Sequence, residues 1–324
     1  MESLDFYQKE FNKYLRGISF LNEPKDLYNP INYILKNGGK RIRPVLTLMA
    51  CESVGKSYKN SLEAATAIEL FHNFSLMHDD IMDSAMVRRG KETAHKIWGV
   101  NSAILSGDAL FVLSYQRLKY YSPDIFYKLS NLLSETALFV CEGQSMDLSF
   151  ETKNSTSIDE YLKMIKLKTA VLIGCALKMG SIVGDTSIIN QDLFYDFGVY
   201  LGIAFQLQDD FLDLYGDKKT FGKEIGGDIL ENKKTILYHI SMMNSNSEQK
   251  TKLLSLYSDK KLESSKKINL VKNIFNESKV KEHTTQIVAQ YTQKSISALE
   301  RISISDLKKS HFKYFAKNLM SRSY

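Results

Sequence analysis

Proline is almost absent from this chain, and its distribution constrains the fold more than any other sequence feature. The 324 residues contain four prolines, and none follows Pro123. Proline removes a backbone donor and interrupts helices, so the 324 − 123 = 201 residues after Pro123 carry no such barrier. This distribution predicts long, uninterrupted helices.

The hydrophobic pattern agrees with helix. Apolar residues recur at three- and four-residue spacing, as in Ala64, Ile68 and Phe71, whereas alternating β-branched runs are nearly absent. Hydrophobic residues make up 44% and charged residues 25%, which is typical of a globular protein that buries a sizeable core. We find no solenoid-length repeat and no composition that demands a boundary. We therefore expect one all-α domain, residues 1–324.

Charge and cysteine usage narrow the class of protein. The net charge is +6, but no run of five Lys or Arg occurs and the bases alternate with acids, so we expect a solvated surface and no nucleic-acid partner. Cys51, Cys141 and Cys175 lie far apart in apolar stretches and are interpreted as buried residues of a reducing compartment. The first residues lack the apolar core of a signal peptide, and the most apolar window, 170–184, is too short to span a membrane. We expect a cytoplasmic protein without a transmembrane segment.

One acidic motif occurs twice with identical spacing. The pattern Asp-Asp-x-x-Asp is formed by Asp79, Asp80 and Asp83, and again by Asp209, Asp210 and Asp213. On a helix the first and third aspartates lie about 40° apart on one face, and the second lies about 100° further round. Two adjacent carboxylates suit Mg²⁺, which prefers few carboxylates together with phosphate oxygens. Acidic residues on a solvated helix face are the alternative, but large apolar neighbours and the repetition disfavour it.

Basic residues near the first motif have the properties of an anion site. The segment Gly38-Gly39-Lys40-Arg41-Ile42-Arg43-Pro44 places a turn before three cations, and Pro44 suits the first turn of a helix. Lys40 and Arg43, three residues apart, can grip a diphosphate. Arg88 and Arg89 follow the first motif closely. His72, by itself, is more often structural than a ligand.

Further cations surround the second motif. Ser157 and Glu160 form a capping-box pattern that opens a helix, residues 161–179, carrying Lys168 and Thr169. The Lys168 side chain is either buried and paired with an anion or extended to solvent, and its position in the sequence does not decide between these alternatives. The glycine-rich loop 221–228 carries Lys223, and Lys233 follows it.

In this order the motifs closely resemble the trans-prenyltransferase (polyprenyl synthetase) family, in particular geranylgeranyl and farnesyl diphosphate synthases. The resemblance runs by motif from Gly38 to about Lys234. It implies a bundle of long, mostly antiparallel helices around a deep central cavity, usually as a homodimer. It also implies Mg²⁺-assisted ionisation of an allylic diphosphate (dimethylallyl, geranyl or farnesyl) and condensation with isopentenyl diphosphate, with three Mg²⁺ ions bound.

The resemblance also assigns roles to particular residues. It implies that Asp79, Asp83 and Asp209 are direct metal ligands, supported by Asp80, Asp210 and Asp213. It implies that the isopentenyl diphosphate subsite comprises Lys40, Arg43, His72 and Arg89, and that the allylic diphosphate is held by Arg88, Lys168, Lys223 and Lys233. Lys168 with Thr169 and Gln206 is implied to be catalytic, and Gln144 to line the same centre. The basic C-terminal tail of some farnesyl synthases is absent from the final residues printed.

Product length is predicted from residues that precede Asp79. Ser75, four residues before it, is small, whereas Phe74 is large enough to enter the path of the growing chain and Phe71 lies one turn deeper. In the family, a lone aromatic at the fifth position resembles geranylgeranyl diphosphate synthases, which implies a C20 product with some C15. The alternative is that Phe74 packs against a neighbouring helix and another residue forms the floor.

Other functions fit the sequence less well. A longer-chain polyprenyl synthase is the main alternative. A terpene cyclase would carry Asn/Asp-x-x-Ser-x-x-x-Glu as its second motif, and a non-catalytic partner subunit tends to lose one aspartate motif, whereas both are intact here.

Overall fold

The computed structural model of the chain describes residues 1–18, 20, 23–153, 156–216, 225–259 and 261–320. The described residues are almost entirely helical, and their β structure is one hairpin of two short strands. The all-α class is therefore confirmed. The chain divides into two compact units, the first of residues 1–135, 175–195 and 303–311, the second of residues 136–174, 196–302 and 312–324. The expectation of a single domain stays a prediction.

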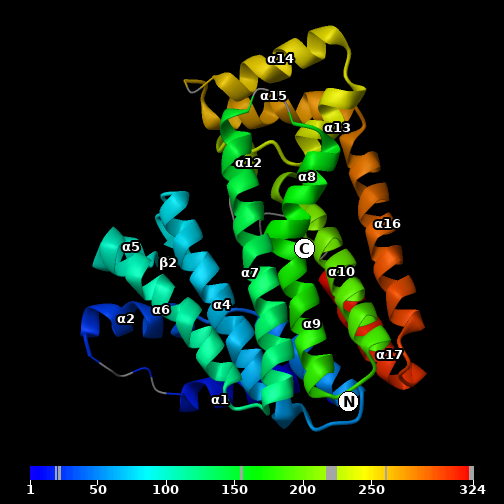
Figure 1. Cartoon of the computed structure of the whole chain (residues 1–324). Helices are drawn as coiled ribbons and strands as arrows, with labels where there is room; N and C mark the ends of the chain where they lie inside the picture. The colour runs from blue at the N-terminus through cyan, green and yellow to red at the C-terminus, as the bar shows by residue number, and fades with distance from the viewer. Residues whose placement is uncertain (19, 21–22, 154–155, 217–224, 260, 321–324) are drawn as a thin grey trace. The chain divides into compact units, whose positions relative to one another are not determined.

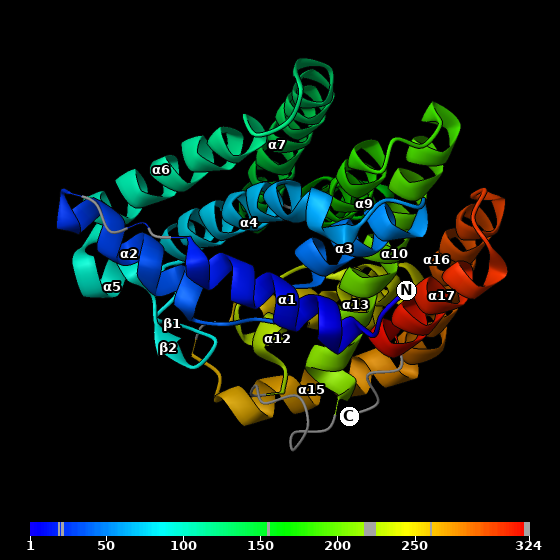
Figure 2. The ribbon, with the colours of Figure 1, turned by 90° about the horizontal axis from the view of Figure 1, so that it is seen from below.

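The first unit begins with helices packed around α4 (Figure 1). Its elements are α1 (Leu4–Gly17), α2 (Lys25–Lys36), α3 (Ile42–Ser53), the 3₁₀ turn η1 (Tyr58–Ser61), α4 (Leu62–Met82), β1 (Val87–Arg88), β2 (Lys91–Glu92), α5 (Ala94–Trp98) and α6 (Val100–Leu118). Helices α4 and α6 lie side by side in Figures 1 and 2, and α2 also packs on α6. Buried side chains such as Leu70, Met77 and Leu110 fill this contact.

The β-hairpin returns the chain to the end of α4. Strands β1 and β2 pair antiparallel, with Arg88 opposite Lys91. Gly90 at the tip has a φ of 76°, which glycine adopts without strain. The hairpin thereby brings Arg88 back beside the aspartates of α4, while Arg89 reaches the Gly38 carbonyl.

The second unit contains most of the C-terminal half of the chain. Its helices are parts of α7 (Pro123–Thr152), α9 (Val171–Val183), α10 (Ile188–Tyr215) and α17 (Asp306–Met320), together with α8 (Ile158–Ile165), α12 (Gly227–Leu230), α13 (Ile236–Asn244), α14 (Ser247–Ser258), α15 (Ser264–Glu277) and α16 (Val280–Arg301). The predicted capping box is confirmed: Ser157 and Glu160 each accept a hydrogen bond from the other's backbone N–H.

The predicted continuous helix 161–179 is wrong in one respect. Residues Lys166–Ala170 form a π turn (η2) between α8 and α9. Two glycines allow other helices to approach this turn: a Cβ on Gly143 of α7 would lie 2.2 Å from the backbone N of Lys168, and one on Gly202 of α10 would lie 2.6 Å from Cα of Ala170. The wide turn is therefore enclosed by backbone on both sides.

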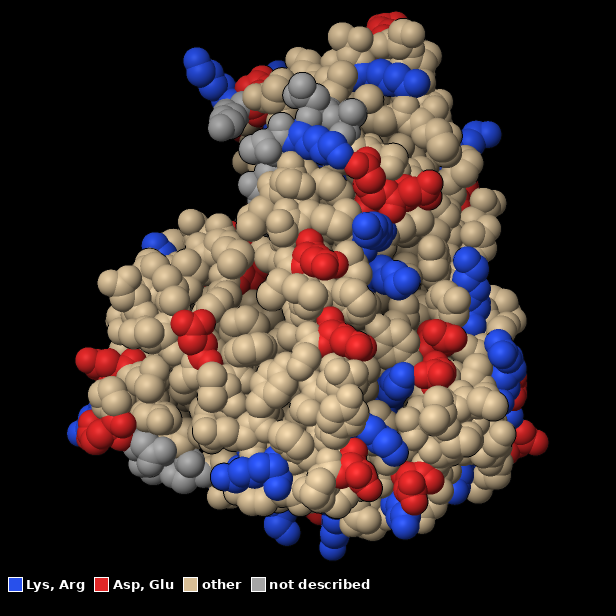
Figure 3. Space-filling model, viewed as in Figure 1, with Lys and Arg blue, Asp and Glu red and all other residues tan. Residues whose placement is uncertain are grey.

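The face of the protein drawn in Figure 3 shows the expected mixture of charges. In Figure 3, basic and acidic side chains are interspersed among larger neutral areas. Within the described residues, no helix combines the length and apolar character needed to cross a bilayer. Cys51 and Cys175 are buried, but Cys141 is exposed, so the expectation of three buried cysteines is wrong for Cys141, which occupies an outward position on α7.

Helices α3 and α9 approach each other closely at Thr47 and Gly180, both in the first unit. Thr47 Oγ1 donates a hydrogen bond to the Ala176 carbonyl over 2.9 Å, and a Cβ on Gly180 would lie 2.1 Å from the Thr47 carbonyl oxygen. Gly180→Ala should force the helices apart and reduce the free energy of unfolding by about 1–3 kcal/mol. Gly17→Ala, at a helical position with nothing within 4 Å, is the matched control and should not destabilise. Urea unfolding of both variants measures the difference; equal stability would contradict the packing.

Candidate functional site

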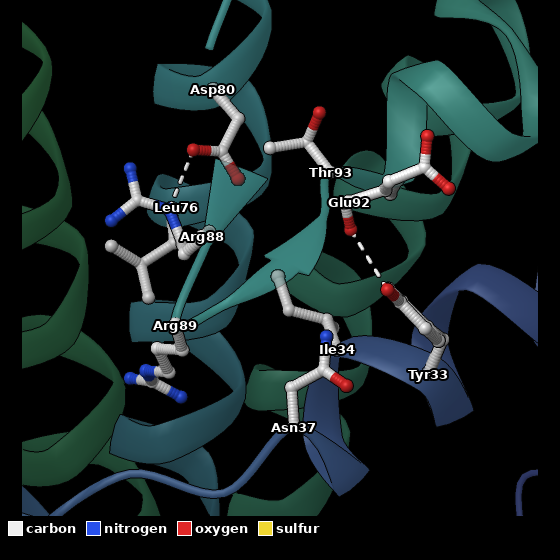
Figure 4. A pocket seen from close by; sticks show the side chains of 10 residues that line it. Tyr33, Ile34, Asn37, Leu76, Asp80, Arg88, Arg89, Glu92 and Thr93 are labelled. Carbon is white, nitrogen blue, oxygen red and sulfur yellow. Dashed lines mark hydrogen bonds and ion pairs between the residues drawn. The ribbon is translucent and has the colours of Figure 1, made fainter. Parts of the chain in front are cut away.

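The first aspartate motif closes α4, and its three carboxylates have different surroundings. Asp80 is 3% exposed and accepts a hydrogen bond from Arg88 Nε over 2.5 Å, as Figure 4 shows. Arg88 also lies 3.5 Å from Asp79 Oδ2. Burial raises the pKa of Asp80, and the Arg88 charge opposes that rise. Asp79 is half-buried and Asp83, which caps the helix, is exposed.

The second motif, on α10, repeats this arrangement within the other unit. Asp210 is 5% exposed and accepts hydrogen bonds from the Tyr161 hydroxyl and, over 3.0 Å, from Gln206 Nε2. Burial, then the charge of Asp228, raises the pKa of Asp210 to about 8. Asp213 Oδ2 accepts the backbone N–H of Asp228 over 3.1 Å. The middle aspartate of each motif is therefore turned inward and held by donors.

This arrangement determines what kind of metal site each motif can form. Among the described residues, no three His, Cys, Asp or Glu side chains converge as a ready-made metal site. The first motif instead leaves Asp79 and Asp83 one helical turn apart, with the middle carboxylate engaged elsewhere. Two hard oxygen ligands fit Mg²⁺, which completes its shell with water and ligand phosphate oxygens. The donor set thus fits a cation that binds together with an anionic ligand.

The turn before α3 buries one of its three cations. Arg41 starts α3 in the left-handed conformation, with a φ of 50°. Its guanidinium donates to the Glu69 carboxylate and, over 2.5 Å, to the Leu35 carbonyl. Glu69 is 2% exposed and also accepts a hydrogen bond from Asn73 over 3.0 Å. Arg41 is therefore a structural cation, and Lys40 and Arg43 remain as the candidates for ligand binding.

Arg43, His72 and Arg89 form a crowded cationic group beside this ion pair. Arg43 lies 3.2 Å from His72 Nε2, and Arg89 donates to the Gly38 carbonyl. Burial lowers the pKa of Arg43 to about 10, and burial also lowers the pKa of Arg89. Burial and the Arg43 charge lower the pKa of His72 well below its usual range, so His72 is neutral and Nε2 accepts from Arg43.

The lowered pKa values have a direct chemical meaning. Each records that a positive charge is costly where it stands, because water has been removed and like charges are near. A bound anion would reverse both effects. Gly39 contributes by lacking a side chain: a Cβ there would lie 2.8 Å from the Arg89 guanidinium. The group therefore has the electrostatic character of an anion subsite.

The π turn links its polar residues to the second motif. Lys168 Nζ lies 2.5 Å from Asp147 Oδ2, with the lysine side chain 25% exposed, so Lys168 is neither buried alone nor simply solvated. Thr169 Oγ1 donates to Gln206 Oε1 over 3.3 Å, and Gln206 donates onward to Asp210. Two of the residues predicted to be catalytic, Thr169 and Gln206, thus belong to one hydrogen-bonded chain that ends on the buried Asp210, whereas Lys168 is paired separately with Asp147.

The remaining predicted residues are placed as follows. Lys233 pairs with Glu231 over 2.6 Å at the surface, Gln144 is half-buried on α7, and Ser75 Oγ donates to the His72 carbonyl over 2.8 Å. Lys223 lies outside the described residues. The first unit holds Lys40, Arg43, Phe71, His72, Phe74, Ser75, Asp79, Asp80, Asp83, Arg88 and Arg89; the second holds Gln144, Lys168, Thr169, Gln206, Asp209, Asp210, Asp213 and Lys233.

A small pocket lies behind the hairpin. Figure 4 shows Arg88 directed at Asp80 and Arg89 pointing away from it, with Tyr33 of α2 donating to the Glu92 carbonyl over 2.8 Å. These bonds anchor the hairpin to α2 and α4. The pocket therefore lies where the hairpin meets α2 and α4.

Three supporting residues were not predicted from the sequence. Glu69 was detectable, because it is a lone acid between Ile68 and Leu70 in an apolar helix. Tyr161 and Asp147 left no such signal, since a tyrosine and an acid are ordinary residues at helix positions.

The comparisons with known proteins agree on one family. The polyprenyl synthetase family profile matches residues 24–275. A crystal structure of a geranylgeranyl pyrophosphate synthase superposes with a TM-score of 0.96 at 46% identity, covering 100% of each chain. The geranylgeranyl pyrophosphate synthase of Geoglobus acetivorans is 42% identical over 217 residues, 66% of this chain and 68% of that protein. The geranylfarnesyl diphosphate synthase of Natronomonas pharaonis is 34% identical over 235 residues, covering 67% and 69%.

The buried pair of Arg41 and Glu69 can be tested by stability. Glu69→Ala leaves Arg41 desolvated without its counter-charge, which should reduce the free energy of unfolding by about 3–5 kcal/mol. Asp192→Ala, which removes the exposed partner of Lys178, is the control and should cost at most about 1 kcal/mol. Denaturant unfolding compares the two. A Glu69→Ala variant as stable as the control would show that Arg41 is not held by this carboxylate.

Proposed function

Because the chain belongs to the polyprenyl synthetase family, it is a prenyltransferase, and we propose that it condenses isopentenyl diphosphate head-to-tail with allylic diphosphates to give a C20 diphosphate. The observation that carries this proposal is the repeated motif whose middle aspartate is held inward, at Asp80 by Arg88 and at Asp210 by Tyr161 and Gln206. With the middle aspartate held in this way, the outer aspartates of each motif are left to bind metal, and the metal in turn binds the diphosphate.

Asp79, Asp83 and Asp209 would hold magnesium, with Asp80, Asp210 and Asp213 as supports. Bound magnesium supplies positive charge that stabilises the departing diphosphate, and the resemblance implies three ions when the allylic substrate is present. Arg88, Lys168, Lys223 and Lys233 would add to that charge. Lys168 is kept in place by Asp147. Ionisation of the allylic C–O bond thus requires no protein nucleophile.

The second substrate is assigned to the cationic group of the first unit. Lys40, Arg43, His72 and Arg89 would bind the diphosphate of isopentenyl diphosphate; the lowered pKa values of Arg43 and Arg89 support this, since an anion relieves the cost of both charges. Neutral His72 orients Arg43. The isopentenyl double bond then attacks the allylic cation, a proton leaves the new intermediate, and the released diphosphate accepts it.

Thr169 and Gln206 are proposed to face the reacting carbons. Their side chains are oriented by the chain of hydrogen bonds that ends at Asp210. Fixed oxygen dipoles stabilise a nearby carbocation without reorganising during the reaction. Gln144 would line the same centre.

A C20 product is supported by the names of the relatives and by the aromatic side chains of α4. Phe74 packs against both Phe71 and Phe111, at ring distances of 5.4 and 5.2 Å. It therefore contacts α6, as the alternative interpretation required, while remaining partly exposed. We propose that this ring ends the path of the growing chain, with Ser75 leaving the path open and Phe71 behind. A longer product is the alternative.

A homodimer in the cytoplasm is proposed as the working form. Helix α6 exposes a short apolar row, Leu105 and Val112, which lie on one face of the helix and are 59% and 54% exposed. Figure 3 shows mainly neutral surface over this helix. A second copy would cover such a row, whereas an isolated surface would carry more charge.

The metal assignment predicts a large loss of turnover. Asp79→Ala and Asp209→Ala should each lower kcat by at least about 100- to 1,000-fold, because charge stabilisation of the departing diphosphate is lost. Asp192→Ala, an exposed acid away from both motifs, should leave kcat unchanged. The measurement is steady-state turnover of variants whose circular dichroism matches the parent. Near-parental turnover of either motif variant would exclude the proposed metal site.

The floor assignment predicts a longer product from a smaller side chain. Phe74→Ala should shift the product from C20 toward C25 and beyond, because the ring that blocks the path is removed. Thin-layer or liquid chromatography after incubation with farnesyl and isopentenyl diphosphates measures the distribution. An unchanged distribution in an active Phe74→Ala enzyme would reject Phe74 as the floor.

A further inference from the structure

Phe74 belongs to a group of rings contributed by α4 and α6. Phe111 of α6 lies 5.2 Å from Phe74 and 6.0 Å from Phe71, and Tyr115 continues the row at 5.3 Å from Phe111. Phe71 is fully buried, whereas Phe74 and Phe111 are only partly buried. Phe74 and Phe111 therefore present surface, and the position of Phe74 depends on what holds its exposed edge.

His78 is one turn further along α4 than Phe74. Its ring lies 4.8 Å from the Phe74 ring in an edge-on arrangement. Its Nε2 lies 3.1 Å from the Ile104 carbonyl oxygen of α6. Because a carbonyl can only accept, Nε2 carries the hydrogen in this contact. One side chain thus joins the floor ring to the backbone of the neighbouring helix.

The space for this ring is made by a glycine. A Cβ on Gly107 would lie 2.3 Å from His78 Nε2 and 2.4 Å from its Cδ2. Glycine within a helix costs about 1 kcal/mol relative to alanine. Gly107 lies well inside α6 and has neither a turn nor a positive φ to explain it. The close approach of the imidazole is the physical reason for glycine at this position.

We propose that His78, seated against Gly107 and bonded to the Ile104 carbonyl, is a positioning residue that holds Phe74 in the chain-length floor and so sets where elongation stops. The inference rests on the proposed function, in which Phe74 is the floor. His78 acts through Phe74 and contacts no reacting atom in this scheme. Its effect is therefore on the distribution of products.

The test approaches the contact from both helices. Gly107→Ala displaces the His78 ring while leaving the sequence of α4, including Asp79, intact. His78→Ala removes the ring itself. In both variants the ratio of C25 to C20 product should rise about fivefold, the factor expected when one hydrogen bond no longer holds the floor. His78→Gln, which keeps an N–H donor, should return the ratio toward the parental value, and Gly17→Ala is the glycine control.

Combining Gly107→Ala with Phe74→Ala distinguishes an effect exerted through Phe74 from a general loosening of the α4–α6 contact. If His78 works only through Phe74, then Phe74→Ala/Gly107→Ala should give the same distribution as Phe74→Ala alone. A further lengthening in the double variant would overturn the proposal, as would active Gly107→Ala and His78→Ala enzymes with the parental distribution. Should His78→Ala fail to fold, Gly107→Ala and His78→Gln decide the outcome. An unaltered product in Phe74→Ala would instead mean that the floor assignment of the proposed function has failed.

Discussion

The ion pair between Glu69 and Arg41 is the interaction on which the cationic group of the first unit depends. The Glu69 carboxylate neutralises Arg41, which enters α3 through a left-handed residue, and it also attracts Arg43 and Arg89, whose pKa values fall despite it. Breaking a buried pair leaves an uncompensated charge, so the turn, the start of α3 and the aim of Arg43 share one electrostatic support. The glycines before Arg41 let the chain reach this position.

The two aspartate motifs, each within its own unit, are stabilised in a similar way. In each motif the protein gives up one of three carboxylates, Asp80 or Asp210, to internal donors. A buried carboxylate must be paired, and the partners are Arg88 in one case and Tyr161 with Gln206 in the other. The middle aspartate of each motif is thus held by protein donors, next to the outer aspartates that we propose as metal ligands. The two motifs share a spacing, but different neighbours stabilise them.

The sequence predicted the helical class, the aspartate spacing and the capping box at Ser157 because these depend on local periodicity and short-range bonds. It did not predict that Arg41 faces inward, because a cation shortly after a glycine turn can equally bind a ligand. It missed the π turn because residue spacing over five positions cannot distinguish one extra residue from a regular helix. The sequence also suggested Phe74 as a floor residue but did not reveal its contacts with Phe111 and His78. The Phe74–Phe111 and His78–Ile104 contacts join residues far apart in the chain.

The π turn at Lys166–Ala170 has a consequence for how this helix tolerates change in length. A π turn holds one residue more than the α-turn it replaces, and that residue rotates everything after it by about 100° about the helix axis. Deleting one residue here would restore a regular helix, with better backbone hydrogen bonding, yet would carry Lys168 away from Asp147 or Thr169 away from Gln206. A regular helix and the present contacts of Lys168 and Thr169 therefore cannot both be kept at this point of the chain. Gly143 and Gly202, which carry no side chain, leave room on either side of the helix for the extra residue of the π turn.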